Sequence, residues 1–343
     1  SMFSETSLTV LWLLFGAGAV AIGVLGTSLA RVLDRLADRT GLGEAFVGAV
    51  MLGACTSLPG ITASVTAAWD GYPVMSLANA LGGIAAQTAF LAIADMAYRK
   101  VNLEHAAASV PNMMQGVLLI ILLAFTVLAM VGPDIDVLGV HPITPVLFVV
   151  YLAGMRMVYK TKSKPMWHPR MTTATRLDEP EEPEAGETLG KLWVGFAISA
   201  VVVVVAGWLV TRTGEAIGAR AGLSDSVMGA LFIAVATSLP ELVTSVAAVR
   251  RGALTMAVGG VIGGNAFDSL FAAVADLFYR PGGLYTAATE YEISLAALVI
   301  LMTAVLLLGL LRREKTGFAN IGFESVAVLV LYLLGLVYFG FSM

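Results

Sequence analysis

Apolar runs long enough to cross a lipid bilayer recur along this chain, and no other feature limits its fold so strongly. A membrane-spanning helix needs about 20 apolar residues. Charged residues make up 13% of the chain and hydrophobic residues 58%, whereas a soluble domain is about 25% charged. The sequence therefore predicts an all-α polytopic membrane protein. Ten transmembrane helices are expected, at about 8–30, 44–68, 74–98, 110–131, 143–159, 191–211, 225–249, 253–279, 291–311 and 319–341.

The two halves of the chain resemble each other in a single register, and we call positions paired in this register repeat-equivalent. Segment 44–99 aligns with 225–280, where 20 of 56 positions are identical without a gap. The chance likeness of two apolar segments does not explain shared Pro, Asp, Arg and Trp residues in one register. We therefore expect a first five-helix repeat at 1–159, a connector at 160–188 and a second repeat at 189–343. Because five is odd, the second repeat must enter the membrane from the opposite side.

Positively charged residues predict the orientation, because Lys and Arg concentrate in cytoplasmic loops. If both termini lie outside, the outer loops carry Arg212, Arg220 and Arg280, and all other Lys and Arg residues lie inside. The expected location is a bacterial or archaeal plasma (inner) membrane, with the connector 160–188 in the cytoplasm.

Inverted repeats are typical of secondary transporters, whose substrate site lies where interrupted helices of both halves meet. Pro59 and Pro240 fall midway along their spans, each after Thr-Ser-Leu, and a proline there frees backbone carbonyls that lipid cannot satisfy. An ordinary kink would explain one such proline, but its repetition favours a site. Glu241 follows Pro240 directly, and Asp268 lies in the next span. Acids at that depth mark ion pathways by default.

Other acidic residues receive structural interpretations. Asp95 and Asp276 each precede an arginine by four residues, Arg99 or Arg280. An i,i+4 ion pair reaching the membrane interface would explain both of them. They are therefore left out of the predicted site.

The segment from Ala236 to Ser245, followed by 259–268 with its Gly-Gly-Asn-Ala-Phe-Asp end, resembles the second alpha-repeat of the sodium/calcium exchanger family, in the cation/calcium antiporter superfamily. The likeness covers nearly the whole chain and indicates a divergent prokaryotic member. In that family four central positions from both repeats form a diamond of ligands, and hydroxyls around the broken helices complete the cation sites. Carried over, the central positions are Gly60, Gln87, Glu241 and Asp268, with Thr56, Ser57, Thr237 and Ser238 beside them and Asn265 flanking.

This chain departs from the family pattern at several ligand positions. Gly60 replaces the expected Glu, Gln87 replaces Asn, and Gly83 and Gly264 replace two serines. Calcium prefers six to eight oxygen ligands with several carboxylates, so antiport is expected while calcium specificity is left open. We also expect Gly60 to leave room for a water or a partly hydrated ion opposite Glu241.

The sequence thus predicts a secondary cation antiporter that works by alternating access. The resemblance to the exchanger family implies that the first and sixth helices slide over a fixed core. The alternative is a proton-coupled monovalent cation exchanger of the Na⁺/H⁺ type, with Glu241 or Asp268 carrying the proton. A scaffold would leave two buried acids unexplained, and the motif of an intramembrane aspartyl protease is missing. The expected partners are inorganic cations (Na⁺, Ca²⁺ or H⁺, as substrates) and the lipid bilayer. We expect a monomer without enzymatic activity, resident cofactor or nucleic-acid partner.

Overall fold

The computed structural model describes residues 3, 5–40, 54–97, 103–106, 109–164, 166–170, 188–251, 254–313 and 322–340. Most of this part of the chain is helical, and its only β feature is a bridge between Val137 and Val140. The helices of the first half are α1 (Leu8–Thr40), α3 (Leu58–Trp69), α4 (Pro73–Ala97), α5 (Leu103–Ala106), α6 (Val110–Val131) and α7 (Ile143–Ser163). The second half contains α8 (Leu189–Ala221), α9 (Asp225–Val227), the π-helix η2 (Met228–Ile233), α10 (Ala234–Thr237), α11 (Leu239–Arg251), α12 (Leu254–Asp268), α13 (Phe271–Asp276), the 3-10 helix η3 (Tyr285–Ala287), α14 (Glu290–Arg312) and α15 (Phe323–Gly340).

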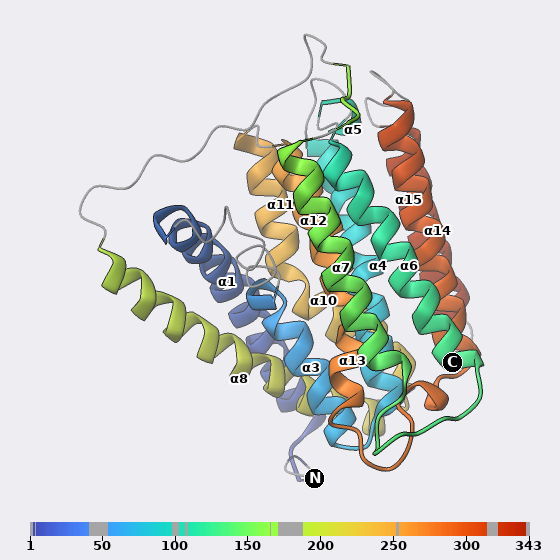
Figure 1. Ribbon diagram of the computed structural model, residues 1–343. Coiled ribbons are helices and arrows are strands. Elements are labelled where there is room, and N and C mark those ends of the chain that lie inside the picture. The colour runs from blue at the N-terminus through green and yellow to red at the C-terminus, as the bar shows by residue number, and fades with distance from the viewer. Residues whose placement is uncertain are drawn as a thin grey trace.

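Helices α1 and α8 are longer than the membrane is thick, and they run obliquely to the other helices (Figure 1). Each has 33 residues, which is about 50 Å at 1.5 Å per residue, against a hydrocarbon core of about 30 Å. Both continue about ten residues past the predicted ends at 30 and 211, because charged residues such as Arg31 and Arg35 end an apolar run without ending a helix. Both ends of α1 are repeat-equivalent to the ends of α8.

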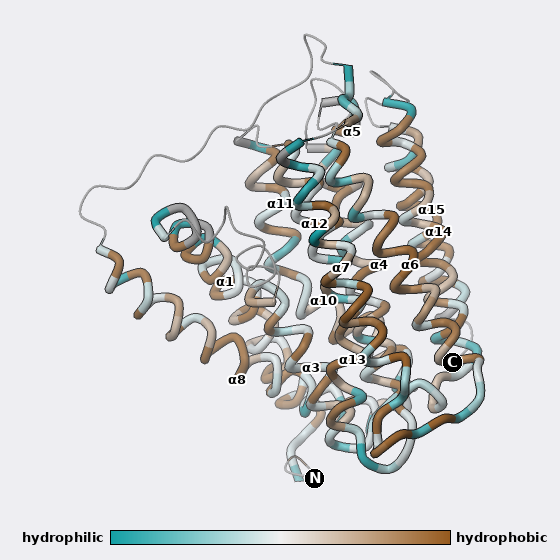
Figure 2. Tube along the Cα trace, in the orientation of Figure 1, coloured by the Kyte–Doolittle hydropathy of each residue, from teal (hydrophilic) through white to brown (hydrophobic). Residues whose placement is uncertain are grey.

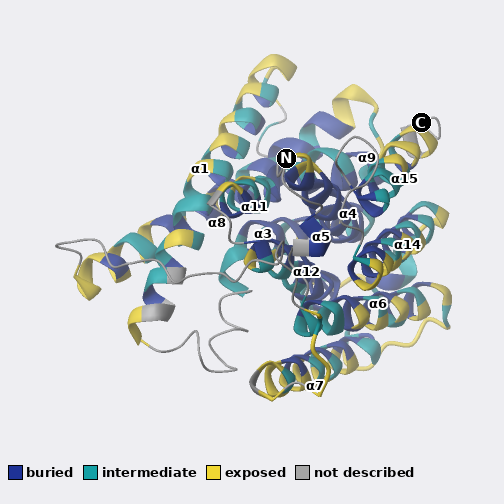
Figure 3. Cartoon of the chain, turned by 90° about the horizontal axis from the view of Figure 1, so that it is seen from above, coloured by how far each residue is buried: buried dark blue, intermediate teal, exposed yellow. Residues whose placement is uncertain are grey.

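Helix α4 lies at the centre of the bundle. Along its most apolar stretch 94% of the residues are buried, and Figure 3 shows it enclosed by the other helices. Small residues make this close packing possible. At Gly82, an added Cβ would lie only 2.5 Å from the Cα of Ala230 in η2. Glycine is therefore required where α4 meets the helices of the second half.

The outer helices turn apolar side chains outward. Leu13, Val149, Val201 and Leu311 are among the large hydrophobic residues exposed on them, and Figure 2 shows the hydrophobic colouring of these helices. Seven of the described helices are long and apolar enough to cross a membrane, and the bent pair from Asp225 to Arg250 makes an eighth. The chain is thus a multi-pass membrane protein. The count of ten stays a prediction, because the span predicted at 44–68 lies partly outside the described residues.

The connector was predicted to begin at 160, but α7 continues to Ser163. The helix continues through its lysines because lysine has a high helix propensity, even though its charge ends the apolar run. At the other end, α8 begins at Leu189, where the second repeat was expected. Residues 171–187 of the connector lie outside the described part of the chain.

The Asp95 carboxylate is buried inside the protein and not exposed at the membrane interface, so that part of the prediction was wrong; Arg99, its predicted partner, lies outside the described residues. The carboxylate is fully buried at the end of α4. It accepts hydrogen bonds from the backbone N–H groups of Leu103 (2.8 Å) and Gly322 (3.2 Å) and from Ser325 Oγ (2.8 Å). These donors lie in α5 and at the start of α15, so the carboxylate binds the N-terminus of a distant helix, where a negative charge is favoured.

Asp276, also fully buried, has an equivalent set of bonds. It accepts from the backbone N–H groups of Leu284 (3.4 Å) and His141 (2.9 Å) and from Thr144 Oγ1 (2.7 Å). Every member of this set is repeat-equivalent to its counterpart around Asp95. Each acid therefore fastens the last long helix of the opposite half, and the interfacial prediction for Asp276 was also wrong.

Candidate cation-binding site

Two interruptions in the helices of the second half bring two acidic side chains into the bundle. Helix α10 ends at Thr237 and α11 begins at Leu239, and the two are bent by 44°. Glu241 lies in the first turn of α11, where the positive end of the helix dipole favours a carboxylate. Asp268 is the last residue of α12, and α13 begins at Phe271. At that carbonyl-bearing end, the dipole adds to the negative charge and favours a cation.

The local sequence explains the first interruption. Pro240 is the second residue of α11, a position where proline is tolerated because its missing N–H would have no partner. The predicted helix break is therefore confirmed, and it lies at Ser238, two residues before the proline. The π-helix η2 before it and the interruption after Asp268 were not predicted from the sequence. Single π-turns often mark functional segments of a helix.

Asp268 is 1% exposed, and both of its carboxylate oxygens accept hydrogen bonds from the first half of the chain. Ser57 Oγ donates to Oδ1 at 2.6 Å, and Gln87 Nε2 donates to Oδ2 at 2.6 Å. The same Gln87 amide donates to Ser238 Oγ at 3.3 Å. Four residues of the predicted set thus meet across the two halves.

The remaining predicted residues surround this cluster. Asn265 Nδ2 donates to Thr88 Oγ1 at 3.0 Å. Thr237 Oγ1 lies 3.5 Å from Asn79 Oδ1. Thr56 is half-buried in the helical turn directly before the Ser57 hydroxyl.

Three side-chain oxygens of the predicted set are buried without a hydrogen-bond donor among the described residues: Gln87 Oε1, Asn265 Oδ1 and Glu241 Oε2. Glu241 as a whole is partly exposed, but this oxygen of its carboxylate is buried. Buried acceptors are normally paired because desolvation without a partner is costly. A cation is the partner that would satisfy amide and carboxylate oxygens together.

The charge of the two acidic side chains also points to a bound cation. Within the described residues, neither Glu241 nor Asp268 forms an ion pair with Lys or Arg, and the pair between Arg212 Nε and Asp70 Oδ2 (2.8 Å) involves neither acid. Glu241 and Asp268 have no third acidic ligand beside them, since no group of three or more His, Cys, Asp or Glu side chains in the described part of the chain is arranged to hold a metal ion. The arrangement suits a hard cation bound by oxygen, with fewer carboxylates than calcium sites usually offer.

Gly60 does not leave the space expected beside it. A Cβ added there would lie 2.3 Å from Phe271 Cε2, so the phenyl ring occupies the place of a side chain. The expectation of room for a water or a hydrated ion was therefore wrong. The reason is tertiary, because this glycine and the ring that covers it lie in opposite halves of the chain.

Sequence reasoning missed three neighbours of the site: Asn79, Thr88 and Phe271. Asn79 is 2% exposed, and its Nδ2 donates to the carbonyl oxygen of Gly60 at 3.2 Å. An isolated amide in an apolar span was an available signal for Asn79. Thr88 directly follows Gln87, but its hydroxyl gave no signal of its own.

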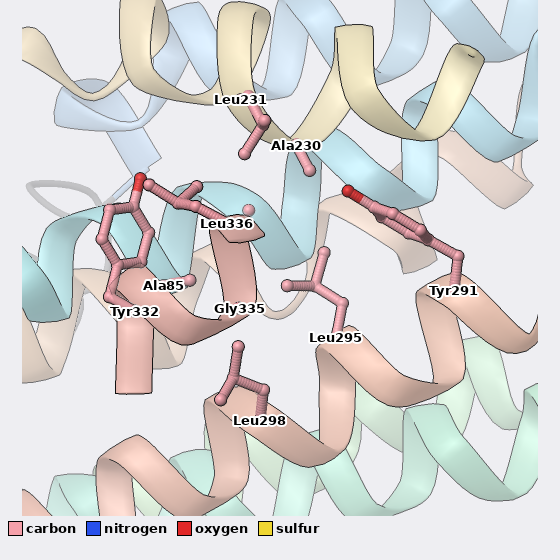
Figure 4. Close-up of a pocket in the computed structure, with 10 residues that line it drawn as sticks. Ala85, Ala230, Leu231, Tyr291, Leu295, Leu298, Tyr332, Gly335 and Leu336 are labelled. Atoms are coloured by element: carbon pink, nitrogen blue, oxygen red, sulfur yellow. The ribbon is translucent and has the colours of Figure 1, made fainter. Parts of the chain in front are cut away.

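A pocket elsewhere in the bundle is not part of this site. Figure 4 shows it between α14 and α15 on one side and α4 and η2 on the other. Its lining is largely hydrocarbon, with Leu295, Leu298 and Leu336 beside the rings of Tyr291 and Tyr332. None of the predicted ligands lines it.

The sequence model described as "Sodium/calcium exchanger protein" matches residues 10–157 and 191–341. The chain belongs to the sodium/calcium exchanger family. Members of this family are secondary transporters and not enzymes. Cation antiport is therefore the general activity of the chain.

Similar proteins agree with this assignment. CaxA of Alkalimonas amylolytica, a putative antiporter by name, is 27% identical over 285 residues, which cover 81% of this chain and 84% of CaxA. The crystal structure of the H⁺/Ca²⁺ exchanger CAX has a TM-score of 0.73 at 13% identity, covering 95% of this chain and 82% of CAX. The sodium-calcium exchanger NCX_Mj has a TM-score of 0.63 at 21% identity, covering 96% and 99%. At these identities the two structures establish a shared fold.

Proposed function

We propose that this exchanger-family protein binds its transported cations at Glu241 and Asp268 and exchanges them by alternating access. The observation that carries the proposal is the set of buried oxygens without donors on Gln87, Asn265 and Glu241, beside the fully engaged carboxylate of Asp268. Competing ions would use the same oxygens in turn, which is the basis of coupled exchange. The proposed unit is a monomer without a resident cofactor.

Ten spans in two inverted repeats are the proposed architecture, with both termini outside and the connector in the cytoplasm. The repeat-equivalent bounds of α1 and α8 support it. So do the matched bonds of Asp95 and Asp276, each of which reaches into the opposite half. Repeats that exchange contacts in this way are expected to share a pseudo-two-fold axis.

Helices α1 and α8 are the proposed moving elements. They pack against each other, and each crosses the helix interruption of the opposite half through a glycine. A Cβ at Gly26 of α1 would lie 2.4 Å from Pro240 Cγ, and a Cβ at Gly207 of α8 would lie 3.0 Å from the carbonyl oxygen of Pro59. These two glycines are also repeat-equivalent. Because the glycine at each crossing carries no side chain, α1 and α8 can slide past the two helix interruptions.

Neutralisation of either acid tests the proposed site. Glu241→Gln and Asp268→Asn should each abolish cation-coupled uptake into proteoliposomes while the protein stays folded, because each removes a buried charge that the cation balances. Glu290→Gln is the matched control, since Glu290 is an exposed carboxylate in the first turn of α14. Transport at the wild-type rate by both site variants would show that cations bind elsewhere.

A proton-coupled monovalent exchanger is the second candidate. The observation that favours it is the absence of a carboxylate at Gly60, which leaves two acids for two monovalent charges. Uptake of radioactive calcium and of radioactive sodium should be measured separately, under imposed sodium and pH gradients. Sodium uptake driven by a pH gradient without calcium uptake would select this candidate, and calcium uptake driven by a sodium gradient would reject it.

A further inference from the structure

The aromatic ring of Phe271 lies directly against Gly60. A Cβ at Gly60 would be 2.3 Å from Phe271 Cε2 and 2.8 Å from Cζ, whereas carbon atoms in contact are about 3.5–4.0 Å apart. Phe271 is 4% exposed and belongs to the largest apolar core cluster of the bundle. No side chain fits at Gly60 unless this packed ring moves.

The backbone at Gly60 is also held in place. Asn79 Nδ2 donates to the carbonyl oxygen of Gly60 at 3.2 Å and to Ser64 Oγ at 2.8 Å. A shift of α3 away from the ring would break these buried bonds, and unsatisfied buried groups are costly. The close approach of ring and glycine is therefore fixed from both sides.

The same position in the second half is built differently. Glu241 is the repeat-equivalent of Gly60, and Phe90 is the repeat-equivalent of Phe271. Both halves thus carry a phenylalanine at the equivalent place, whereas a carboxylate replaces the glycine only in the second. Beside Gly60 the site is bounded by the hydrocarbon ring of Phe271, whereas the equivalent position of the second half carries the carboxylate of Glu241.

We propose that Phe271 is a specificity-determining residue, whose ring seals the Gly60 side of the site against carboxylate and water and so makes it select monovalent cations over calcium. This inference rests on the proposed function, in which Glu241 and Asp268 bind the transported cation. A calcium ion needs six to eight oxygens and keeps water where protein oxygens are lacking. A hydrocarbon wall supplies no oxygen and leaves no space for water, whereas a monovalent ion needs less neutralising charge.

A double-variant cycle tests the role of the ring. Calcium affinity is measured by equilibrium binding of radioactive calcium to purified wild type, Gly60→Glu, Phe271→Ala and the double variant, each checked for folding by size-exclusion chromatography. Gly60→Glu alone should bind calcium no more tightly than wild type, because the ring blocks the new carboxylate. The double variant should bind about tenfold more tightly or better, since calcium affinity follows the number of charged ligands.

The matched control pairs Gly60→Glu with Phe90→Ala, which removes the equivalent ring of the other half and should give no gain. A tenfold gain from Gly60→Glu alone, or from the Phe90 pair, would overturn the proposal. So would a folded double variant without tighter binding. Phe271→Ala alone keeps the native glycine, and calcium should then compete at least about threefold better with sodium uptake. Unchanged competition in this variant would overturn the proposal even if the double variant did not fold.

One further variant separates this proposal from the proposed function. Adding Glu241→Gln to the double variant should remove the calcium binding gained. Gained binding that survives Glu241→Gln would refute the placement of the site at Glu241. Loss of binding with Glu241→Gln, combined with no difference between Gly60→Glu and the double variant, would refute the role of Phe271 alone.

Discussion

Replacing Asp95 by Asn should destabilise the protein by about 2–4 kcal/mol, although the two side chains have the same shape. The carboxylate accepts three hydrogen bonds and is fully buried. An amide keeps one acceptor oxygen. In the better orientation that oxygen faces Gly322 and Ser325, and the amide NH₂ group then confronts the N–H of Leu103, so that one donor is left unpaired.

The magnitude follows from those three bonds. A hydrogen bond to a charged group contributes about 1.5–3 kcal/mol, and a neutral bond about 0.5–1.5 kcal/mol. Asp95→Asn loses one charged bond outright and weakens the other two, and the smaller desolvation of a neutral amide offsets part of the loss. Asp276→Asn should cost a similar amount, because its carboxylate accepts the same kinds of bond from equivalent positions.

Unfolding in mixed detergent micelles, followed by the fluorescence of the five tryptophans, measures the loss. Glu290→Gln is the matched control and should change the free energy of unfolding by no more than about 1 kcal/mol, the contribution of an exposed charge at a helix N-terminus. If Asp95→Asn and Asp276→Asn both fall within that range, the buried carboxylates do not fasten the two halves. A difference of several kcal/mol between the two would refute their equivalence.

Three further predictions concern the moving helices and the site. Gly26→Ala should slow transport by about tenfold or more, because overpacking against the proline ring of α11 costs about 1–3 kcal/mol. The control Gly16→Ala lies on the same helix with nothing within 4 Å of the added carbon, and it should transport at the wild-type rate. Equal transport rates of the two variants would contradict the sliding contact. Cys55, half-buried next to the site, should react with membrane-permeant thiol reagents more slowly when the transported cation is bound, and labelling rates that no cation changes would count against a site at this helix. Gly264→Ser adds a Cβ 3.7 Å from Gln87 Oε1 and so places its hydroxyl near this oxygen. The new hydrogen bond should raise the free energy of unfolding in cation-free buffer by about 0.5–1.5 kcal/mol. No increase would mean that the hydroxyl does not reach this oxygen.

Several features of the protein could be predicted from the sequence because each depends on short stretches of chain. Apolar run length indicated most of the helices, and the register of the sequence repeat reappears in the bounds of α1 and α8. The Thr-Ser-Leu-Pro segment of the second half placed the helix interruption within two residues. Glu241 and Asp268 stand out in the sequence because a carboxylate inside an apolar span is costly, and their role as cation ligands stays a prediction.

What only the tertiary structure decided are the contacts between the two halves. No local pattern shows that Phe271 covers Gly60, that Gln87 and Ser57 donate to Asp268, or that Asp95 reaches the start of α15. Asp95 was misread because an arginine four residues away offers a simple local partner, whereas its real donors lie up to 230 residues along the chain. Hydropathy is a property of each residue and its immediate neighbours, so it predicts which segments are helical. The chemistry of the site depends on which side chains the close packing of small residues brings together, and that is determined only when the two halves interlock.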